Sequence, residues 1–400
     1  MDRRSIAARP LIPRTVWALG FVSLFMDLSS EFIHALLPVF LVSTMGMSVA
    51  ALGVLEGAAE ATTMIVKTFS GPISDWLGKR KGLLLAGYGL AALSKPLFPL
   101  ATAPATVVVA RIVDRIGKGI RGAPRDALVA DVAPPDIRGA CYGLRQSMDT
   151  IGAIGGPLFA IPLMLYFGDH VRTVLWFAVV PAFVCVALLW AGVREPDRPA
   201  LERHFRAPLH WRAAREFAPR YWLVVAIGGT FSLARFSEAF LVLRAQQTGI
   251  DYAWIPAVMV VMNVAYALCA YPVGKLADTI DREGLLVAGL GLLLVSDLLL
   301  GASLSPLALF VGVAAWGLHM GFTQGVLSAM VADTAPSALR GTAFGLFNLV
   351  SGLAMLLSSA IAGWLWQRYG APATFFTGAG LVAAPLALCA STRRRTPPAG

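Results

Sequence analysis

Long apolar segments alternate with short polar segments along the whole chain. An α-helix needs about 20 apolar residues to cross a bilayer, and many of these segments reach that length. Glycine, proline and charged residues separate them and predict twelve transmembrane helices, at about 15–44, 50–69, 82–101, 105–132, 142–166, 173–193, 221–243, 252–273, 285–303, 306–330, 341–366 and 373–390. The expected fold class is therefore an all-α integral membrane protein.

Composition supports this assignment. The chain has 400 residues, of which 57% are hydrophobic and 14% charged, and its mean hydropathy is +0.70. Soluble domains carry roughly a quarter charged residues. In a soluble protein the net charge of +10 would suggest a nucleic-acid partner, but here it fits the Lys/Arg excess of cytoplasmic loops, so no nucleic acid is expected. The spacing of the four cysteines matches neither a disulfide framework nor a zinc site, so we expect them in the core.

The basic residues fall in alternate loops, which predicts the orientation of the chain. One set of loops holds Arg3, Arg4, Arg9, Arg14, Lys79, Arg80, Lys81, Arg138, Lys275, Arg282, Arg340, Arg393, Arg394 and Arg395. The opposite loops hold only Arg172, Arg244 and Arg368. Both termini are thus expected in the cytoplasm of a bacterium, with the chain in its inner membrane and the first helix uncleaved.

The two halves of the chain repeat each other. Residues 129–144 resemble residues 331–346, and residues 71–80 resemble residues 274–282 at a similar offset. This duplication predicts a six-helix bundle at 1–193, a basic cytoplasmic linker at 194–220 and a second six-helix bundle at 221–400. A pseudo-twofold axis normal to the membrane would relate the bundles, with the substrate between them. The linker would touch anionic lipid headgroups, or serve as a regulatory docking site.

The first predicted helix carries three polar groups on one face. Asp27, Glu31 and His34 are spaced i, i+4, i+7, so they project to the same side. A charge at the bilayer centre costs about 3 kcal/mol on the more lenient scale. This face must therefore meet a wet or charge-paired interior, which favours a transporter.

Other charges inside predicted helices extend this interior. Glu56 and Glu60 form an acidic stripe, and Arg111, Arg115 and Lys118 form a basic stripe on another helix. The stripes can neutralise each other, in which case neither indicates the charge of the substrate. The residues predicted to form the substrate or proton pathway are Asp27, Glu31, His34, Glu56, Glu60, Arg111, Asp114, Arg115, Lys118, Asp149, Arg235 and Glu238.

Local motifs resemble the major facilitator superfamily over the whole chain. Residues 71–81 resemble its signature loop between helices 2 and 3, residues 143–157 resemble its antiporter motif with Ala160 in place of a glycine, and the loop recurs in the second half. The gate residues that this resemblance implies are Gly71, Asp75, Gly78, Lys79, Arg80, Gly274 and Asp278, with Arg138 and Arg340 in the repeated loop. The antiporter-motif residues are Gly143, Gly152, Gly156 and Pro157; the same spacing also suits simple helix packing.

The resemblance implies a secondary active transporter that works by alternating access, most simply a proton-coupled exporter in a bacterial subgroup with mostly unassigned substrates. Its partners would be a small solute, protons and membrane lipids. The proton gradient would supply the energy, with no cofactor, and the monomer would be the functional unit. An alternative makes Asp27, Glu31 and His34, with His319 from the other half, ligands for a divalent metal or metal chelate. No motif of an intramembrane enzyme appears, so we expect no enzymatic activity; a non-transporting receptor is the remaining alternative.

Overall fold

The computed structural model describes residues 11–168, 170–195, 213–277, 279–302, 305–336 and 339–393. No strand occurs in these residues. The helices of the first half are α1 (Arg14–Val39) with the π-helix η1 (Phe40–Thr44), α2 (Val49–Leu77), α3 (Lys81–Ser94) with α4 (Leu97–Leu100), α5 (Pro104–Val132), η2 (Pro135–Ile137), α6 (Arg138–Phe167), α7 (Val171–Leu175), η3 (Trp176–Ala178) and α8 (Val179–Gly192). The helices of the second half are η4 (Ala213–Glu216), α9 (Pro219–Ala234), α10 (Ala239–Gln247), η5 (Tyr252–Trp254), α11 (Ala257–Leu276), α12 (Arg282–Ala302), α13 (Pro306–Thr334), α14 (Arg340–Tyr369), α15 (Ala371–Leu381) and α16 (Ala383–Arg393).

These helices join into twelve membrane-length units, six in each half. In the described part of the chain, eleven of them are long and apolar enough to span a membrane. The twelfth is α5, which has the length, at 29 residues, but carries more charge than an isolated span would hold. The predicted fold class is confirmed.

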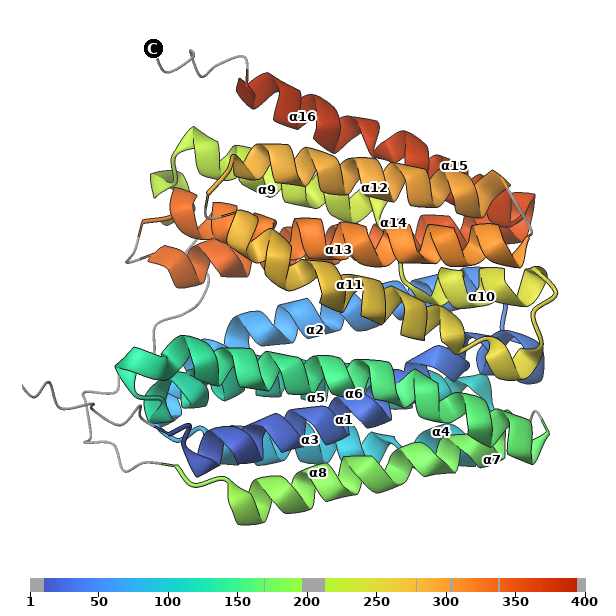
Figure 1. Cartoon of the computed structure of the whole chain (residues 1–400), viewed down its shortest axis with the longest axis horizontal. Helices are drawn as coiled ribbons and strands as arrows, with labels where there is room; N and C mark the ends of the chain where they lie inside the picture. The colour runs from blue at the N-terminus through green and yellow to red at the C-terminus, as the bar shows by residue number, and fades with distance from the viewer. Residues whose placement is uncertain are drawn as a thin grey trace, which may run out of the picture.

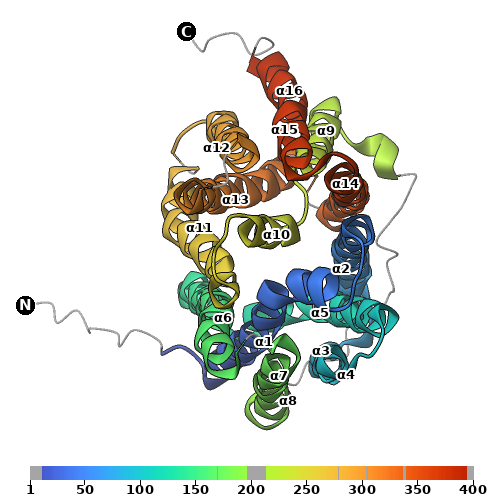
Figure 2. The ribbon, with the colours of Figure 1, turned by 90° about the vertical axis from the view of Figure 1, so that its right-hand side faces the viewer.

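The two halves lie side by side with their helices along a common direction (Figure 1). Viewed from one end, α1–α8 and α9–α16 form two groups that meet along α2 with α14 and α6 with α11 (Figure 2). The helix α5 begins at Pro104 and its counterpart α13 at Pro306, 202 residues later; α6 and α14 begin at Arg138 and Arg340 with the same offset. We call the end at which α1 begins and α16 ends the terminal end, and the opposite end the far end.

The junction of α2 with α14 depends on glycines that let the two backbones touch. A Cβ added to Gly53 of α2 would lie 2.3 Å from the carbonyl oxygen of Ser359, and one added to Gly363 of α14 would lie 2.7 Å from that of Val49. Gly57 meets the backbone of Leu356 in the same way. Small residues allow such close approach between transmembrane helices, so this seam joins the halves firmly.

One predicted helix proved to be two. The sequence pattern predicts a continuous helix at 221–243, but α9 ends at Ala234 and α10 begins at Ala239. Serines of α14 stabilise this break: Ser358 Oγ donates to Leu233 O at 2.8 Å, and Ser359 Oγ accepts from Ser237 N at 3.2 Å. Backbone groups freed by a break in lipid need such partners. The helix also begins earlier than predicted, at Pro219, within the predicted linker, of which residues 196–212 lie outside the described residues.

Candidate substrate cavity

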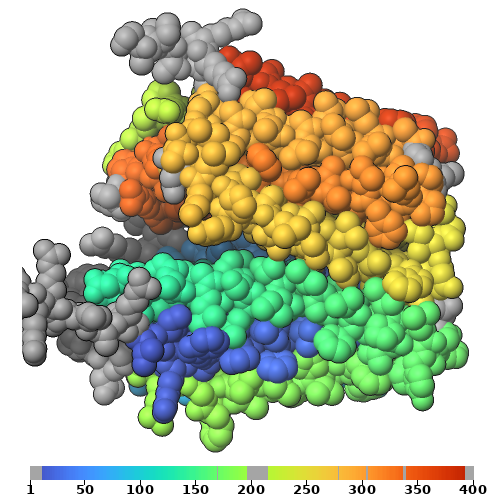
Figure 3. All heavy atoms as spheres, viewed as in Figure 1, coloured from blue at the N-terminus to red at the C-terminus, as the bar shows by residue number. Residues whose placement is uncertain are grey.

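A cavity of about 460 Å³ lies between the halves, lined by residues of both. It continues into a lobe of about 290 Å³ toward the end of α5 and the beginning of α6. The space-filling view shows the molecule hollowed between the halves at the terminal end, whereas the halves are in contact toward the far end (Figure 3). The structure therefore shows a central cavity that is reached from the terminal end.

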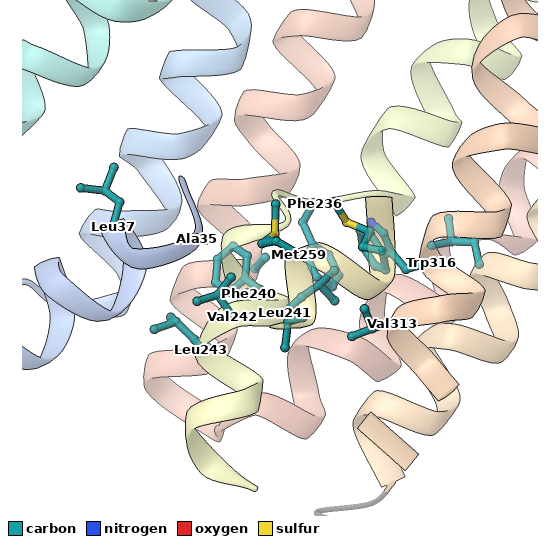
Figure 4. Close-up of a cluster of buried hydrophobic side chains, with 14 of the residues drawn as sticks. Ala35, Leu37, Phe236, Phe240, Leu241, Val242, Leu243, Met259, Val313 and Trp316 are labelled. Atoms are coloured by element: carbon teal, nitrogen blue, oxygen red, sulfur yellow. The ribbon is translucent and has the colours of Figure 1, made fainter. Parts of the chain in front are cut away.

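Apolar side chains close the far end. Ala35 of α1 lies beside Phe240 of α10, whereas Leu37 points away from α10 (Figure 4); these residues and Leu243 are all buried. Hydrogen bonds between described residues also cross between the halves at this end: Gln246 Nε2 donates to Ser43 Oγ at 2.8 Å, and Ala50 N donates to Gln367 Oε1 at 3.1 Å. The seal is thus mainly hydrophobic, with polar contacts at its rim.

The polar face of α1 is joined to α2 and α5 by a chain of charged groups. His34 Nδ1 lies 3.5 Å from Glu31 Oε2, and His34 Nε2 lies 3.8 Å from Glu56 Oε2. Arg111 holds Glu56 through two bonds, Nη2 to Oε2 at 2.7 Å and Nε to Oε1 at 3.1 Å. Both Glu56 and Arg111 are almost completely buried within the first half. The two parallel hydrogen bonds between them offset the cost of burying both charges.

Three further charges of α5 are also paired. The ion pairs are Lys95–Asp114 at 2.8 Å, Arg115–Glu60 at 3.2 Å and Arg125–Asp149 at 3.5 Å, and within α6 Arg145 also contacts Asp149 at 2.5 Å. Lys95 Nζ also donates to Ser30 Oγ at 2.9 Å, which ties α3 to α1. The acidic and basic stripes seen in the sequence therefore neutralise each other to a large extent.

The predicted pathway residues divide into two groups. Those that line the cavity or its lobe are Asp27, Glu31, His34, Glu60, Arg115, Lys118, Asp149, Arg235 and Glu238. Glu56, Arg111 and Asp114 are buried in ion pairs and do not line it. These three are better described as structural charges that hold α2, α3 and α5 together.

The second half gives the cavity a different wall. Its charged groups there are Arg235 and Glu238, which pair with each other within the break between α9 and α10. The remainder combines apolar side chains with uncharged polar ones. The apolar residues include Phe231, Met259, Met262, Met320, Phe347 and Met355, and the polar ones include Ser232, Ser237, Gln324, Ser328 and Ser351. Ser237 Oγ reaches across to Glu56 Oε2 at 3.5 Å, so the break also contacts the first half.

Sequence reasoning missed some of these residues. Asn263 lines the cavity and donates through Nδ2 to Ala153 O of α6 at 3.0 Å, bridging the halves. Asn263 could have been predicted from the sequence, because it is a polar amide within the apolar segment 252–273. The methionines gave no such signal, because they are distant in sequence and common in helical cores.

The gate residues lie at the terminal end. Arg80 contacts Asp75 at 3.1 Å and Asp131 at 2.7 Å, and its backbone N donates to Glu195. In the second half Arg282 pairs with Asp333, two residues that occupy the corresponding positions. The described contacts of Asp75 are thus within its own half.

The other described gate residues lie in the same loops or in the helices that border them. Gly78 ends α2 with φ +65°, a left-handed conformation that favours glycine. Lys79 follows it, and Gly71 lies within α2. Gly274 lies near the end of α11, Arg138 and Arg340 begin α6 and α14, and Asp278 lies outside the described residues.

The glycines of the predicted antiporter motif pack against α1. A Cβ on Gly152 would lie 2.4 Å from Leu24 O, and one on Gly156 would lie 2.5 Å from Leu28 O. Pro157 lies inside α6, next to this contact. Gly143 has no neighbour within 4 Å at the corresponding position. These contacts bring α6 against α1 next to Asp27, whose Cβ would lie 3.1 Å from a Cβ on Gly152.

The metal-ion alternative lacks a ligand set in the described part of the chain. No group of three or more His, Cys, Asp or Glu side chains there is placed to hold an ion. His319 is completely buried and lies edge-to-face with Trp316, at 5.2 Å between ring centroids, and it does not line the cavity with His34.

Comparison with known proteins settles the family. The sequence pattern described as the Major Facilitator Superfamily matches residues 19–262 and 237–400. The chain belongs to the major facilitator superfamily. An uncharacterized MFS-type transporter of Methanocaldococcus jannaschii is 31% identical over 362 residues, which cover 89% of each chain. A multidrug resistance protein, MdtH, of Edwardsiella ictaluri is 25% identical, with 91% of this chain and 87% of the relative covered.

The superfamily fold is equally evident in three dimensions. A bacterial homolog of the human lysosomal transporter Spinster, crystallised in an inward-facing and unoccupied conformation, superposes with a TM-score of 0.71. The superposition covers 98% of this chain and 100% of the other at 15% identity, so it supports the fold alone. This major facilitator superfamily chain is thus a multi-pass membrane transporter.

Proposed function

We propose that this protein is a proton-coupled secondary active transporter that exports a small solute by alternating access. The observation that carries the proposal is the central cavity, open at the terminal end and closed at the far end, with carboxylates of α1 in its wall. Asp27 and Glu31 exchange the coupling protons, and His34 positions Glu31 through their 3.5 Å contact. Similarity to multidrug resistance proteins supports the outward direction.

Charge distribution supports an orientation with the terminal end in the cytoplasm of a bacterial cell. The loops at that end include Arg14, Lys79–Lys81, Arg138, Lys275 and Arg340, whereas Arg172, Arg244 and Arg368 lie at or near the far end. Lys and Arg are enriched in cytoplasmic loops. In this orientation the cavity faces the cytoplasm, where an exporter takes up its solute, and a single chain supplies the whole cavity.

A distance measurement across the far end tests the mechanism without knowledge of the solute. Spin labels would be attached at Ser43→Cys and Gln246→Cys, in a background whose four native cysteines are replaced by alanine. Proton-coupled alternating access predicts that the label distance lengthens in part of the population when pH changes across the titration of the coupling carboxylates. Glu31→Gln and Asp27→Asn should each reduce this response to pH.

Matched controls make the result decisive. Glu216→Gln removes an exposed carboxylate that does not line the cavity and should leave the pH response of the parent unchanged. A distance distribution that stays the same at every pH in the parent protein would reject proton coupling. A pH response that persists in Glu31→Gln and Asp27→Asn together would reject these two carboxylates as the coupling groups.

A further inference from the structure

Ion pairing leaves only a few cavity charges free to meet a solute. In the cavity wall Glu60 is paired with Arg115, and Arg235 with Glu238. Among the described residues, Lys67, Lys118 and Arg121 have no carboxylate within 4 Å, and Asp27 has no basic partner within that distance. The guanidinium of Arg121 lies instead over the ring of Tyr88, 4.7 Å from its centroid. Glu31 has only the imidazole of His34.

The free charges are concentrated where the cavity joins its lobe. Glu31, Lys67, Lys118 and Asn263 border both spaces, and Asp27 lies in the lobe. Apart from Arg121, which is stacked on Tyr88, two ammonium groups and two carboxylates therefore face the same region, together with one amide. All the charged groups come from α1, α2 and α5, so a solute would meet them on one side only.

This balance favours a solute that carries both charges. A lone anion would bind near two carboxylates, and a lone cation near two ammonium groups, in a site where water screens charge less than in bulk. A solute with separate anionic and cationic groups can satisfy both sets. The methionines and phenylalanines of the opposite wall offer an adaptable apolar surface for the rest of the molecule.

We propose that the cavity binds small amphipathic zwitterions, with the solute's carboxylate on Lys118 and Lys67 and its ammonium on Glu31 and Asp27. The apolar body lies against Met259, Met262 and Met320. This inference rests on the proposed transport function and specifies its substrate class. It also explains how the solute is exchanged for protons, because the solute's ammonium group and a proton compete for the same carboxylates.

Three compounds that share one apolar body test the proposal by thermal stabilisation of the purified full-length protein. They are L-phenylalanine as zwitterion, 2-phenylethylamine as cation and 3-phenylpropionate as anion. We expect phenylalanine to bind at least about tenfold more tightly than either singly charged compound. Phenylalanyl-phenylalanine, its C-terminal amide and its N-acetyl derivative repeat the comparison with a larger body.

Two variants assign the charged groups. Lys118→Gln should lower the affinity for the zwitterion to that for the cation, while binding of the cation is kept or improved. Glu31→Gln should instead lower it to the affinity for the anion. Lys275→Gln changes an exposed lysine outside the cavity and should match the parent. Unliganded melting temperatures identify any variant that fails to fold, for which Lys67→Gln or Asp27→Asn replaces it.

Equal stabilisation by all three compounds, preference for a singly charged one, or no stabilisation in either series would overturn the zwitterion assignment. So would an unchanged preference in Lys118→Gln. These outcomes are separate from failure of the transport mechanism, because the binding assay needs no turnover and the spin-label measurement needs no solute.

Discussion

The two halves share a scaffold but use opposite means to build their side of the cavity. In the first half α1 runs without interruption, and its polar face is joined to α2 and α5 by ion pairs. In the second half the equivalent helix is broken at 235–238, and serines of α14 bind the freed backbone groups. A duplicated fold can therefore become asymmetric in function while its helix lengths and offsets are preserved.

Position 156 and its counterpart 202 residues later show how this difference arises. Gly156 of α6 lets the backbone of α1 approach so closely that a methyl group would clash with Leu28 O. The corresponding residue of α14 is Ser358, whose hydroxyl reaches Leu233 O at the end of α9. A glycine thus accompanies the continuous helix, and a hydroxyl accompanies the broken one.

The largest expected effect comes from unpairing a buried charge of the first half. Arg111→Met leaves Glu56 buried without its partner and should lower the free energy of unfolding by about 3–5 kcal/mol. The double variant Arg111→Met, Glu56→Leu should recover most of this loss. Unfolding would be followed by thermal denaturation in detergent, and a double variant as unstable as the single one would contradict the assignment of the pair as structural.

The second half supplies the contrast for that experiment. Asp297 of α12 is completely buried, and neither of its carboxylate oxygens has a hydrogen-bond partner among the described residues. Asp297→Asn breaks no ion pair and should change stability by less than about 1 kcal/mol. Asp114→Asn, which leaves Lys95 unpaired, should behave like Arg111→Met. Equal losses in both aspartate variants would remove the proposed difference between the halves.

A smaller effect is expected where α6 touches α1. Gly156→Ala places a methyl group 2.5 Å from Leu28 O and should destabilise the protein by about 1–3 kcal/mol. Gly143→Ala is the matched control in the same helix, because it has open space, and should be neutral or slightly stabilising. Similar melting temperatures for the two variants would show that the contact is not close in solution.

The serines at the break should contribute less again. Ser358→Ala removes the donor to Leu233 O and should cost about 1 kcal/mol. Ser147→Ala removes an exposed hydroxyl that bonds only within its own helix and should have almost no effect. Hydrogen exchange at residues 234–239 should rise in Ser358→Ala and stay unchanged in the control.

The smallest difference concerns the two terminal-end gates. Arg80 is 8% exposed and contacts Asp75 and Asp131, whereas Arg282 is 29% exposed and pairs with an Asp333 that is 61% exposed. Arg282→Ala should therefore change stability by less than about 1 kcal/mol, as exposed pairs do. Arg80→Ala should cost more, and the reverse order in melting temperature would contradict the comparison.

The sequence was sufficient to predict the fold class, because length, hydropathy and the internal repeat each identify helices that must bury polar groups. It also identified Asp27, Glu31 and His34 as one polar face. It could not show that Glu56 and Arg111 turn toward each other rather than toward the cavity, since helix periodicity does not define rotation between helices. The break at 235–238 was missed for a related reason: the residues that stabilise it, Ser358 and Ser359, lie more than 100 residues away.

The pairing of α5 also bears on how the chain enters the membrane during synthesis. Each buried arginine, lysine or aspartate costs roughly 2.5–3.5 kcal/mol at the centre of an isolated helix, so α5 alone is a poor candidate for insertion. Its partners Glu56, Glu60 and Lys95 belong to helices that precede it along the chain. When α5 emerges from the ribosome, the partners of Arg111, Asp114 and Arg115 have already been made, whereas Asp149, the partner of Arg125, follows on α6. The order of synthesis itself thus lowers the barrier to insertion of α5.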